Sequence, residues 1–399
     1  MRTLLATTAV ALFTAVALGC HGGSAQSGSA GSGGSGGGAG GSPPVTPAWL
    51  EDAQILVSGE TTNNDDCTTG ICRHSENTDL INWQSAIYLV HRTAESQVLG
   101  PNSSLRISKS TDGGKSFTLQ AIIPALPTRD IRDPHFYVVG DELHIKTLTR
   151  LPVNSTRDSN VDTIAQGTST TDGVHWSPLA PIGPEMWSFW RIKQQGGIYY
   201  SAAYADGDLS VSLYSSPDGV TWTQGAQVYG VSADTPLETE LTFMPSGKLL
   251  ALVRMDGTDA ELLGDIAPLR TNVCWADPPY SAFTCPQTFV GERLDGPLSF
   301  FHDGRLFVVA RKHLGADDRK RTSLYEITGT LEGGPLSIME WGELPSAGDT
   351  SYAGVATIDA THSLLSWYSG NLVKDEGWAL GMFDITDIWQ GTLDFSKLQ

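Results

Sequence analysis

The stretch Ser110-Thr-Asp-Gly-Gly-Lys-Ser-Phe117 decides the fold, because shortened copies of it recur downstream. The copies are Thr170-Thr-Asp-Gly-Val-His-Trp176 and Ser216-Pro-Asp-Gly-Val-Thr-Trp222. In each, a hydroxyl residue lies two positions before an Asp, a Gly follows the Asp, and an aromatic residue ends the unit. This order is typical of a hairpin turn. The Asp side chain accepts backbone N–H groups, the Gly takes a positive φ, and the ring fills the apolar layer beneath.

The spacing of these turns predicts a repeat architecture. Asp112, Asp172 and Asp218 are 60 and 46 positions apart, about the length of one four-stranded sheet. Three unrelated surface turns would have no reason to keep such a spacing, whereas a β-propeller or another repeat array would.

From Trp49 onward, short β-type runs alternate with turn residues, and pairs of apolar strands joined by a tight turn recur. Counting these pairs gives six blades, so we predict an all-β, six-bladed propeller in one domain over residues 47–399. We expect Ala379–Phe383 to close the ring by sharing a blade with the segment after Ala53. The blades are predicted to start near Asn82, Asp133, Arg191, Glu238, Gly296 and Tyr352.

The charge excludes two classes of partner. The 399 residues include 44 acidic and 25 basic ones, a formal net charge of −19. Such a chain does not attract nucleic acid or an anionic membrane surface. A bound anion would need a local arginine cluster. The nine histidines show no ligand-like spacing and no phosphate-binding glycine loop precedes a helix, so we expect no metal or cofactor.

The first residues predict export. Arg2 and the apolar run Leu4–Leu18 indicate a signal peptide over residues 1–19 that is too short to span a bilayer. The run ends in Val16-Ala-Leu-Gly-Cys20, similar to a bacterial lipoprotein cleavage box, although an ordinary signal peptide remains the alternative. We predict lipidation of Cys20, a Gly/Ser-rich tether over residues 20–46, and a monomer anchored in the bacterial envelope through its lipid.

Four further cysteines form two close pairs in the sequence. In an exported chain, an even number of cysteines predicts the disulfides Cys67–Cys72 and Cys274–Cys285. A zinc site is the alternative, but the two spacings fit no zinc pattern well.

The turn units resemble the Asp-boxes of the sialidase superfamily, whose members are six-bladed propellers. Glu238 to Arg254 is similar to the family segment with a Glu on one inner strand and a substrate-binding Arg on the next. Leu306-Phe-Val-Val-Ala-Arg311 resembles the strand with a further arginine of the family's triad. Asp349-Thr-Ser-Tyr-Ala-Gly354 resembles the segment with the catalytic tyrosine. The resemblance covers roughly residues 70–370.

The resemblance implies Tyr352 as nucleophile and Glu238 or Glu240 as its base. Guanidinium groups grip a sugar carboxylate through paired hydrogen bonds, and a neutral nucleophile is not repelled by an anionic glycoside. Arg254 and Arg311 would hold the carboxylate, with Arg73 or Arg92 as the third arginine.

The sequence also departs from the family. Arg73-His-Ser stands where the family has Arg-Ile-Pro, the expected acid Asp after Arg92 is missing, and Trp367-Tyr368 replaces a late Glu. Asp133 is therefore a candidate acid or base. Arg132 and Arg191 could indicate a different anionic or neutral glycan, and Trp190 could be a packing residue or a sugar platform. Each charged residue could instead join neighbouring blades through ion pairs.

These patterns predict an exported, lipid-anchored glycoside hydrolase of the sialidase-like type. A polysaccharide lyase on the same fold is one alternative, because arginines and tyrosine also serve β-elimination. The other is a non-catalytic propeller that binds glycan or protein at the cell surface, since a fold alone does not determine function.

Overall fold

The computed structural model describes residues 45–59, 66–98, 100–151, 163–205, 210–232, 235–256, 269–315 and 318–398. The predicted signal peptide, Cys20 and the tether up to residue 44 lie outside the described residues. Among the described residues, no helix is long and apolar enough to cross a membrane.

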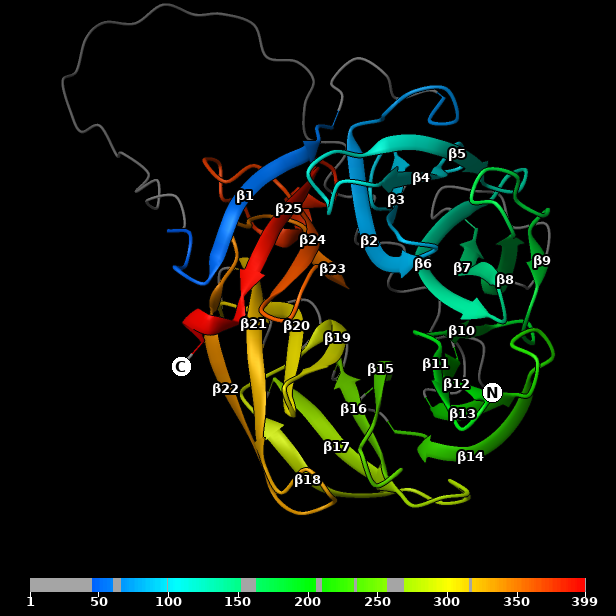
Figure 1. Ribbon diagram of the computed structural model, residues 1–399, viewed down its shortest axis with the longest axis vertical. Helices are drawn as coiled ribbons and strands as arrows, with labels where there is room; N and C mark the ends of the chain where they lie inside the picture. The colour runs from blue at the N-terminus through cyan, green and yellow to red at the C-terminus, as the bar shows by residue number, and fades with distance from the viewer. Residues whose placement is uncertain are drawn as a thin grey trace, which may run out of the picture. The chain divides into compact units, whose positions relative to one another are not determined.

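The described residues form six antiparallel sheets arranged as the blades of a ring (Figure 1). This confirms the predicted all-β, six-bladed propeller. Blade 1 contains β2 (His74–Trp83), β3 (Ala86–Ala94), β4 (Ser104–Ser110) and β5 (Thr118–Pro124). Blade 2 contains β6 (Asp130–Val139), β7 (Glu142–Arg150), β8 (Thr163–Thr170) and β9 (Ala180–Pro181). Blade 3 contains β10 (Trp187–Phe189), β11 (Lys193–Gln195), β12 (Ile198–Ala205), β13 (Val211–Ser216) and β14 (Thr223–Tyr229).

Blades 4 and 5 follow the same order. Blade 4 contains β15 (Pro236–Phe243), β16 (Leu249–Met255), β17 (Arg270–Ala276) and β18 (Thr284–Val290). Blade 5 contains β19 (Asp295–His302), β20 (Arg305–His313), β21 (Lys320–Gly329) and β22 (Leu336–Glu343). The innermost strands of blades 3, 4, 5, 6, 1 and 2 contact one another in that order, and between blades 2 and 3 the innermost strand β10 contacts β7 and β8.

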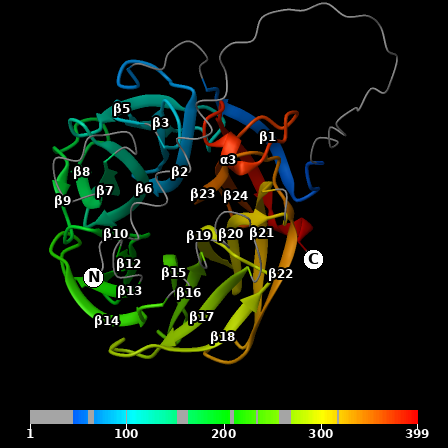
Figure 2. The same cartoon turned by 180° about the vertical axis from the view of Figure 1, so that it is seen from behind.

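Blade 6 is built from both ends of the described chain. It contains β23 (Thr350–Thr357), β24 (His362–Ser369), β25 (Asp387–Asp394) and, outermost, β1 (Leu50–Val57), which pairs with β25 (Figure 1). The expectation that the first strand closes the ring is confirmed, but the partner that we predicted is wrong. Residues 378–381, in the connection from β24 to β25, instead form the short helix α3 (Trp378–Gly381) (Figure 2). The 3₁₀ turn η1 (Phe395–Lys397) follows β25.

Apolar side chains fill each of the six contacts between neighbouring blades. Between blades 5 and 6, for example, Trp49, Phe307 and Trp367 belong to one buried cluster. The clusters elsewhere have the same composition of aliphatic and aromatic residues. Since apolar burial drives the packing, the polar groups of the inner strands are left at the middle of the ring.

The three recurring turns have the chemistry that the sequence predicts. They join β4 to β5 in blade 1, β8 to β9 in blade 2 and β13 to β14 in blade 3. In blade 2, Asp172 accepts the backbone N–H groups of Val174 and His175, both at 2.8 Å, and Gly173 has a φ of 77°. The closing rings Phe117, Trp176 and Trp222 pack against apolar clusters. Because strands alternate in direction, these turns lie at the opposite end of the propeller from the start of each innermost strand.

Candidate active site at the start of the inner strands

The innermost strands share a distortion near their starts. In five blades the pairing register slips within the same short stretch. In blade 3 the strand is interrupted between β10 and β11. Such bulges redirect side chains. In four blades a residue within the slip has a positive φ, namely Asn77 (53°), Asp133 (48°), Gly296 (56°) and Tyr352 (47°).

A tyrosine–glutamate pair lies at this level of the ring. Tyr352 Oη donates to Glu238 Oε1 at 2.5 Å, which joins blade 6 to blade 4. Both residues are buried, and the ring of Trp190 packs edge-on against Tyr352 with centroids 5.9 Å apart. Burial and the Glu238 carboxylate raise the pKa of Tyr352 well above its usual range. The phenol is therefore neutral and needs a base to react, and Glu238 is in position to be that base.

Arg254, at the end of β16, holds the same glutamate. Its Nη1 donates to Glu238 Oε2 at 2.6 Å and lies 3.4 Å from Tyr352 Oη. Its other nitrogens contact Asp256 at 2.5 and 3.0 Å, and Asp295 at 3.0 Å. Arg254 is thus paired with three carboxylates, and it fixes the orientation of Glu238.

Arg311, at the end of β20, lies below the tyrosine ring. Its guanidinium carbon is 5.1 Å from the centroid of Tyr352. Its Nη2 donates to Asp349 Oδ1 at 2.9 Å and to Tyr368 Oη at 2.8 Å, and its Nε donates to the carbonyl of Thr350 at 2.8 Å. Asp349 and Tyr368 therefore orient this arginine.

Asp133 comes from the bulge of blade 2. It contacts the side-chain amide of Asn77, and the buried Lys146 donates to its carbonyl at 3.2 Å. Burial raises the pKa of Asp133 to about 6, with the charge of Lys146 opposing the shift and that of Glu238 adding to it. A carboxyl group with this pKa can give and take a proton near neutral pH.

The other arginines have different surroundings. Arg132 donates to Asp130 at 2.6 Å, and its side chain is 14% exposed. Arg92 is fully buried between Glu76 and Asp130. Arg191 pairs with Asp79 at 2.8 Å and joins blades 3 and 1. Arg73 is 36% exposed and is 3.6 Å from Asp384. Of these four, Arg132 is the one next in sequence to Asp133 and partly open to solvent.

Two residues that the sequence predicted for the site, Glu240 and Trp190, instead hold blades together. Glu240 accepts from the backbone N–H and the hydroxyl of Ser299, at 2.9 and 2.8 Å, and from Lys193 at 2.7 Å. It therefore joins blades 3, 4 and 5. The indole N–H of Trp190 donates to the carbonyl of Pro297 at 3.1 Å, and its side chain is 1% exposed. The structure brings Glu238, not Glu240, to Tyr352, and it makes Trp190 a packing residue behind that pair.

Sequence reasoning missed the carboxylates and rings that hold the arginines. Asp256 and Asp295 on Arg254, and Asp349 and Tyr368 on Arg311, were not assigned a role. A usable signal existed for Asp256, because it lies two positions after an arginine at a strand end. The other three are far from their partner in sequence, and the packing of neighbouring blades brings them together.

Both predicted disulfides are confirmed, Cys67–Cys72 and Cys274–Cys285. Two groups among the described residues have the donor types of a metal site. In the partly buried group Glu51, His362 and Asp394, the Nζ of Lys397 contacts Glu51 and is 3.4 Å from Asp394, so the Lys397 ammonium already supplies a positive charge there. The second group, His74, Glu76 and Asp349, is considered below.

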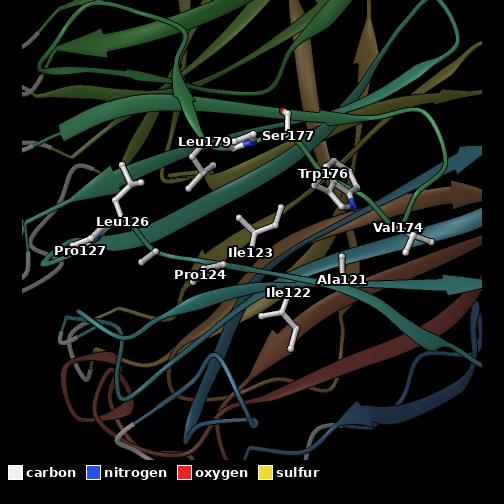
Figure 3. Close-up of a pocket in the computed structure, with 12 residues that line it drawn as sticks. Ala121, Ile122, Ile123, Pro124, Leu126, Pro127, Val174, Trp176, Ser177 and Leu179 are labelled. Carbon is white, nitrogen blue, oxygen red and sulfur yellow. The ribbon is translucent and has the colours of Figure 1, made fainter.

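A groove of about 560 Å³ lies elsewhere, between β5 and the turn that precedes β9 (Figure 3). Apolar side chains line it, among them Ile123, Trp176 and Leu179. None of the residues around Tyr352 contributes to it, so it is separate from the candidate site.

Solved structures share this fold. A Trypanosoma rangeli sialidase in complex with 2,3-difluorosialic acid, described as a covalent intermediate, aligns with a TM-score of 0.61 and 14% identity over 88% of this chain and 59% of that chain. NanB sialidase from Streptococcus pneumoniae aligns with a TM-score of 0.60 and 10% identity over 87% of this chain and 71% of that chain. A protein of unknown function from Dyadobacter fermentans aligns with a TM-score of 0.60 and 17% identity over 86% of this chain and 99% of that chain.

No family model matches the sequence, and no curated protein is similar to it. At 10–17% identity, the structural likeness shows the fold alone: the chain is a sialidase-like six-bladed β-propeller. It spans less than two thirds of the T. rangeli sialidase.

Proposed function

We propose that this protein is an exported glycoside hydrolase of the sialidase-like type that acts on an anionic glycan, with Tyr352 as nucleophile and Glu238 as its base. The observation that carries the proposal is the 2.5 Å hydrogen bond between the two side chains, buried beside Arg254 and Arg311. A phenol that donates to a carboxylate is the arrangement that a tyrosine nucleophile needs.

In the first step, the Tyr352 oxygen forms a bond to the anomeric carbon while Glu238 takes the phenolic proton. The bond to the leaving oxygen breaks, and the protonated Asp133 gives that oxygen its proton. In the second step, Asp133, now a carboxylate, takes a proton from water, and the water oxygen displaces Tyr352. Glu238 returns its proton to the phenolate, so the enzyme is restored and the sugar keeps its anomeric configuration.

The anionic group of the glycan would contact Arg311 and Arg132. Arg254 is already paired with three carboxylates, so its charge is available to Glu238 and Tyr352 rather than to a ligand. Arg132 has one carboxylate partner, and its side chain is more exposed than those of Arg254 (10%), Arg191 (5%), Arg311 (3%) and Arg92 (0%). Arg73 and Arg92 do not fit the role of third arginine, since Arg73 pairs with Asp384 and Arg92 is already shared between Glu76 and Asp130.

The experiment is an assay of fluorogenic sialosides and of uronic-acid polymers, with wild type and the variants Tyr352→Phe and Tyr325→Phe. Tyr325 is a buried tyrosine of blade 5, so its variant controls for the loss of a phenol from the core. We expect wild type and Tyr325→Phe to hydrolyse an anionic glycoside and Tyr352→Phe to be inactive. Hydrolysis by Tyr352→Phe at the wild-type rate would refute the nucleophile. Unsaturated products from the polymer would identify a lyase, and binding without turnover would identify a glycan-binding propeller.

The two disulfides are typical of exported proteins. We propose in addition that Cys20 is lipidated and anchors the propeller in the bacterial envelope through the segment up to residue 46. Metabolic labelling with a fatty-acid analogue tests this. We expect label on the wild-type chain and none on Cys20→Ser, with the variant released from the membrane fraction. An unlabelled wild-type chain would contradict the anchor.

A further inference from the structure

We propose that His74 is a buried imidazolium that holds the two carboxylates orienting Arg92 and Arg311, and that its charge strengthens binding of the anionic group; this last part rests on the proposed function. His74 lies on β2, next to the junction of blades 1 and 6, and its side chain is fully buried. It does not contact Tyr352, so it would act as a positioning residue.

The hydrogen-bond partners of the His74 imidazole determine which of its two nitrogens carry a hydrogen. Nδ1 is 3.0 Å from the backbone carbonyl of Asp384, and a carbonyl oxygen only accepts, so Nδ1 carries a hydrogen. Nε2 is 3.2 Å from Asp349 Oδ2 and 3.5 Å from Glu76 Oε2. A bare Nε2 would point its lone pair at two carboxylates. Because such an arrangement is repulsive, Nε2 also carries a hydrogen, and the ring is positively charged.

Each carboxylate is shared with an arginine. The other oxygen of Asp349 accepts from Arg311 at 2.9 Å, and the other oxygen of Glu76 contacts Arg92. Arg92 in turn pairs with Asp130, which also accepts from Arg132. Charges of opposite sign therefore alternate along a row of side chains from blade 2 through blades 1 and 6 to blade 5. We call this row the charge row, and its order is Arg132, Asp130, Arg92, Glu76, His74, Asp349, Arg311.

The charge of His74 decides whether the charge row carries a net positive charge. With a charged His74 ring the charge row has four cations and three anions, and with a neutral ring it has three of each. The surplus positive charge lies between Arg132 and Arg311, the two arginines that we assign to the anionic group. Burial by itself would lower the pKa of His74, but hydrogen bonds to Asp349 and Glu76 raise it to about 9, so the ring stays charged at neutral pH.

The groups that face His74 come from six elements or their flanks, and one of them is Asp384, which lies before β25 and whose carbonyl accepts from Nδ1. Glu76 lies on the same strand, Arg92 on β3, Arg311 on β20, Tyr368 on β24, and Asp349 directly before β23. His74, Glu76 and Asp349 could also be ligands of a divalent cation. Such an ion would add one charge more than the imidazolium does, to a place already flanked by Arg92 and Arg311, so the imidazolium fits better.

The first test is NMR of the full chain labelled with 15N-histidine, between pH 6 and 10. We expect one ring that keeps both nitrogens protonated at pH 8 and that is missing from His74→Gln. His91, buried in the same blade, is the internal control, because burial lowers its pKa to about 4 and its ring should be neutral throughout. The wild-type spectrum alone refutes the proposal if no buried ring is charged at pH 8. A stoichiometric metal found by elemental mass spectrometry would also overturn it.

The second test is kinetic and uses the anionic fluorogenic glycoside. We expect His74→Gln to raise KM roughly tenfold with a smaller change in kcat, the result of weaker anion binding. His91→Gln should leave KM unchanged. A fall in kcat without a change in KM for His74→Gln would refute the binding role. If wild type cleaves no glycoside, the proposed function fails while the NMR result still decides the protonation of His74.

Discussion

At the scale of single residues, the site depends on how burial changes acid–base behaviour. Tyr352 is buried and its pKa is raised, so the phenol is unreactive until Glu238 takes its proton. Asp133 is partly buried, and its raised pKa makes it a better proton donor at neutral pH. The same physical effect therefore suits one group to nucleophilic attack with a base and the other to acid catalysis.

Asp133 gives a prediction of pH dependence. As the acid it must be protonated, and its folded-state pKa is about 6, so kcat/KM should fall as pH rises through about 6. In Asp133→Asn this limb should vanish, and kcat at pH 5.5 should fall by roughly 10²–10⁴-fold. Initial rates from pH 4 to 9 measure both effects. A wild-type profile that rises through pH 6, or a variant that keeps the alkaline limb, would remove Asp133 from this role.

The residue types of the site could be read from the sequence, but their partners could not. Tyr352, Glu238, Arg254 and Arg311 stand at the ends of recognisable strand pairs, where a propeller places its functional groups. The choice of Glu238 over Glu240 depends on which bond each side chain makes across the ring, and the strand pattern is the same for both. Asp349 and Tyr368 were missed because their partner Arg311 lies in another blade.

At the scale of elements, the bulges of the inner strands direct the side chains. Gly296 shows how closely blades 5 and 6 meet. Its φ is 56°, its N–H donates to Glu238 Oε2 at 2.8 Å, and an added Cβ would lie 2.8 Å from the Tyr352 ring. A Gly at this bulge thus serves both the backbone conformation and the position of the Tyr352 ring.

We predict that Gly296→Ala removes activity while Gly304→Ala does not. Gly304 has a φ of 76° and open space around its Cβ position. Gly304→Ala should therefore lower the free energy of unfolding only by the cost of a positive φ for alanine, roughly 1–2 kcal/mol. Gly296→Ala has that cost and also displaces the Tyr352 ring. Thermal unfolding and initial rates, measured on both variants, separate the two effects. Equal activities in the two folded variants would show that the contact with Tyr352 does not matter.

At the scale of the whole molecule, closure of the ring is what assembles the site. The sequence predicted six blades because the turns and strand pairs repeat, and that inference needs only local chemistry. It placed the closing partner of the first strand wrongly, at Ala379–Phe383. Pairing between strands more than 300 residues apart leaves no local signal, and the apolar residues of α3 resemble those of a short strand.

Closure also gives a stability prediction. β1 is the outermost strand of blade 6, and Trp49 and Leu50 at its start are buried in the cluster between blades 5 and 6. A chain without residues 1–58 should therefore lose several kcal/mol of stability, since each large apolar side chain contributes about 1.5–3 kcal/mol. A chain without residues 1–44 is the matched control and should keep the wild-type Tm. Equal Tm values for both truncated chains would contradict closure by β1.

The most direct test of the central claim is covalent trapping with 2,3-difluorosialic acid, followed by intact-mass and peptide mass spectrometry. Attack by Tyr352 would release fluoride from the anomeric carbon and leave a fluorosialyl group on the tyrosine oxygen. We expect this adduct on the peptide that contains Tyr352 in wild type, and no adduct in Tyr352→Phe. An adduct on another residue, or no adduct from a protein that hydrolyses sialosides, would contradict the account.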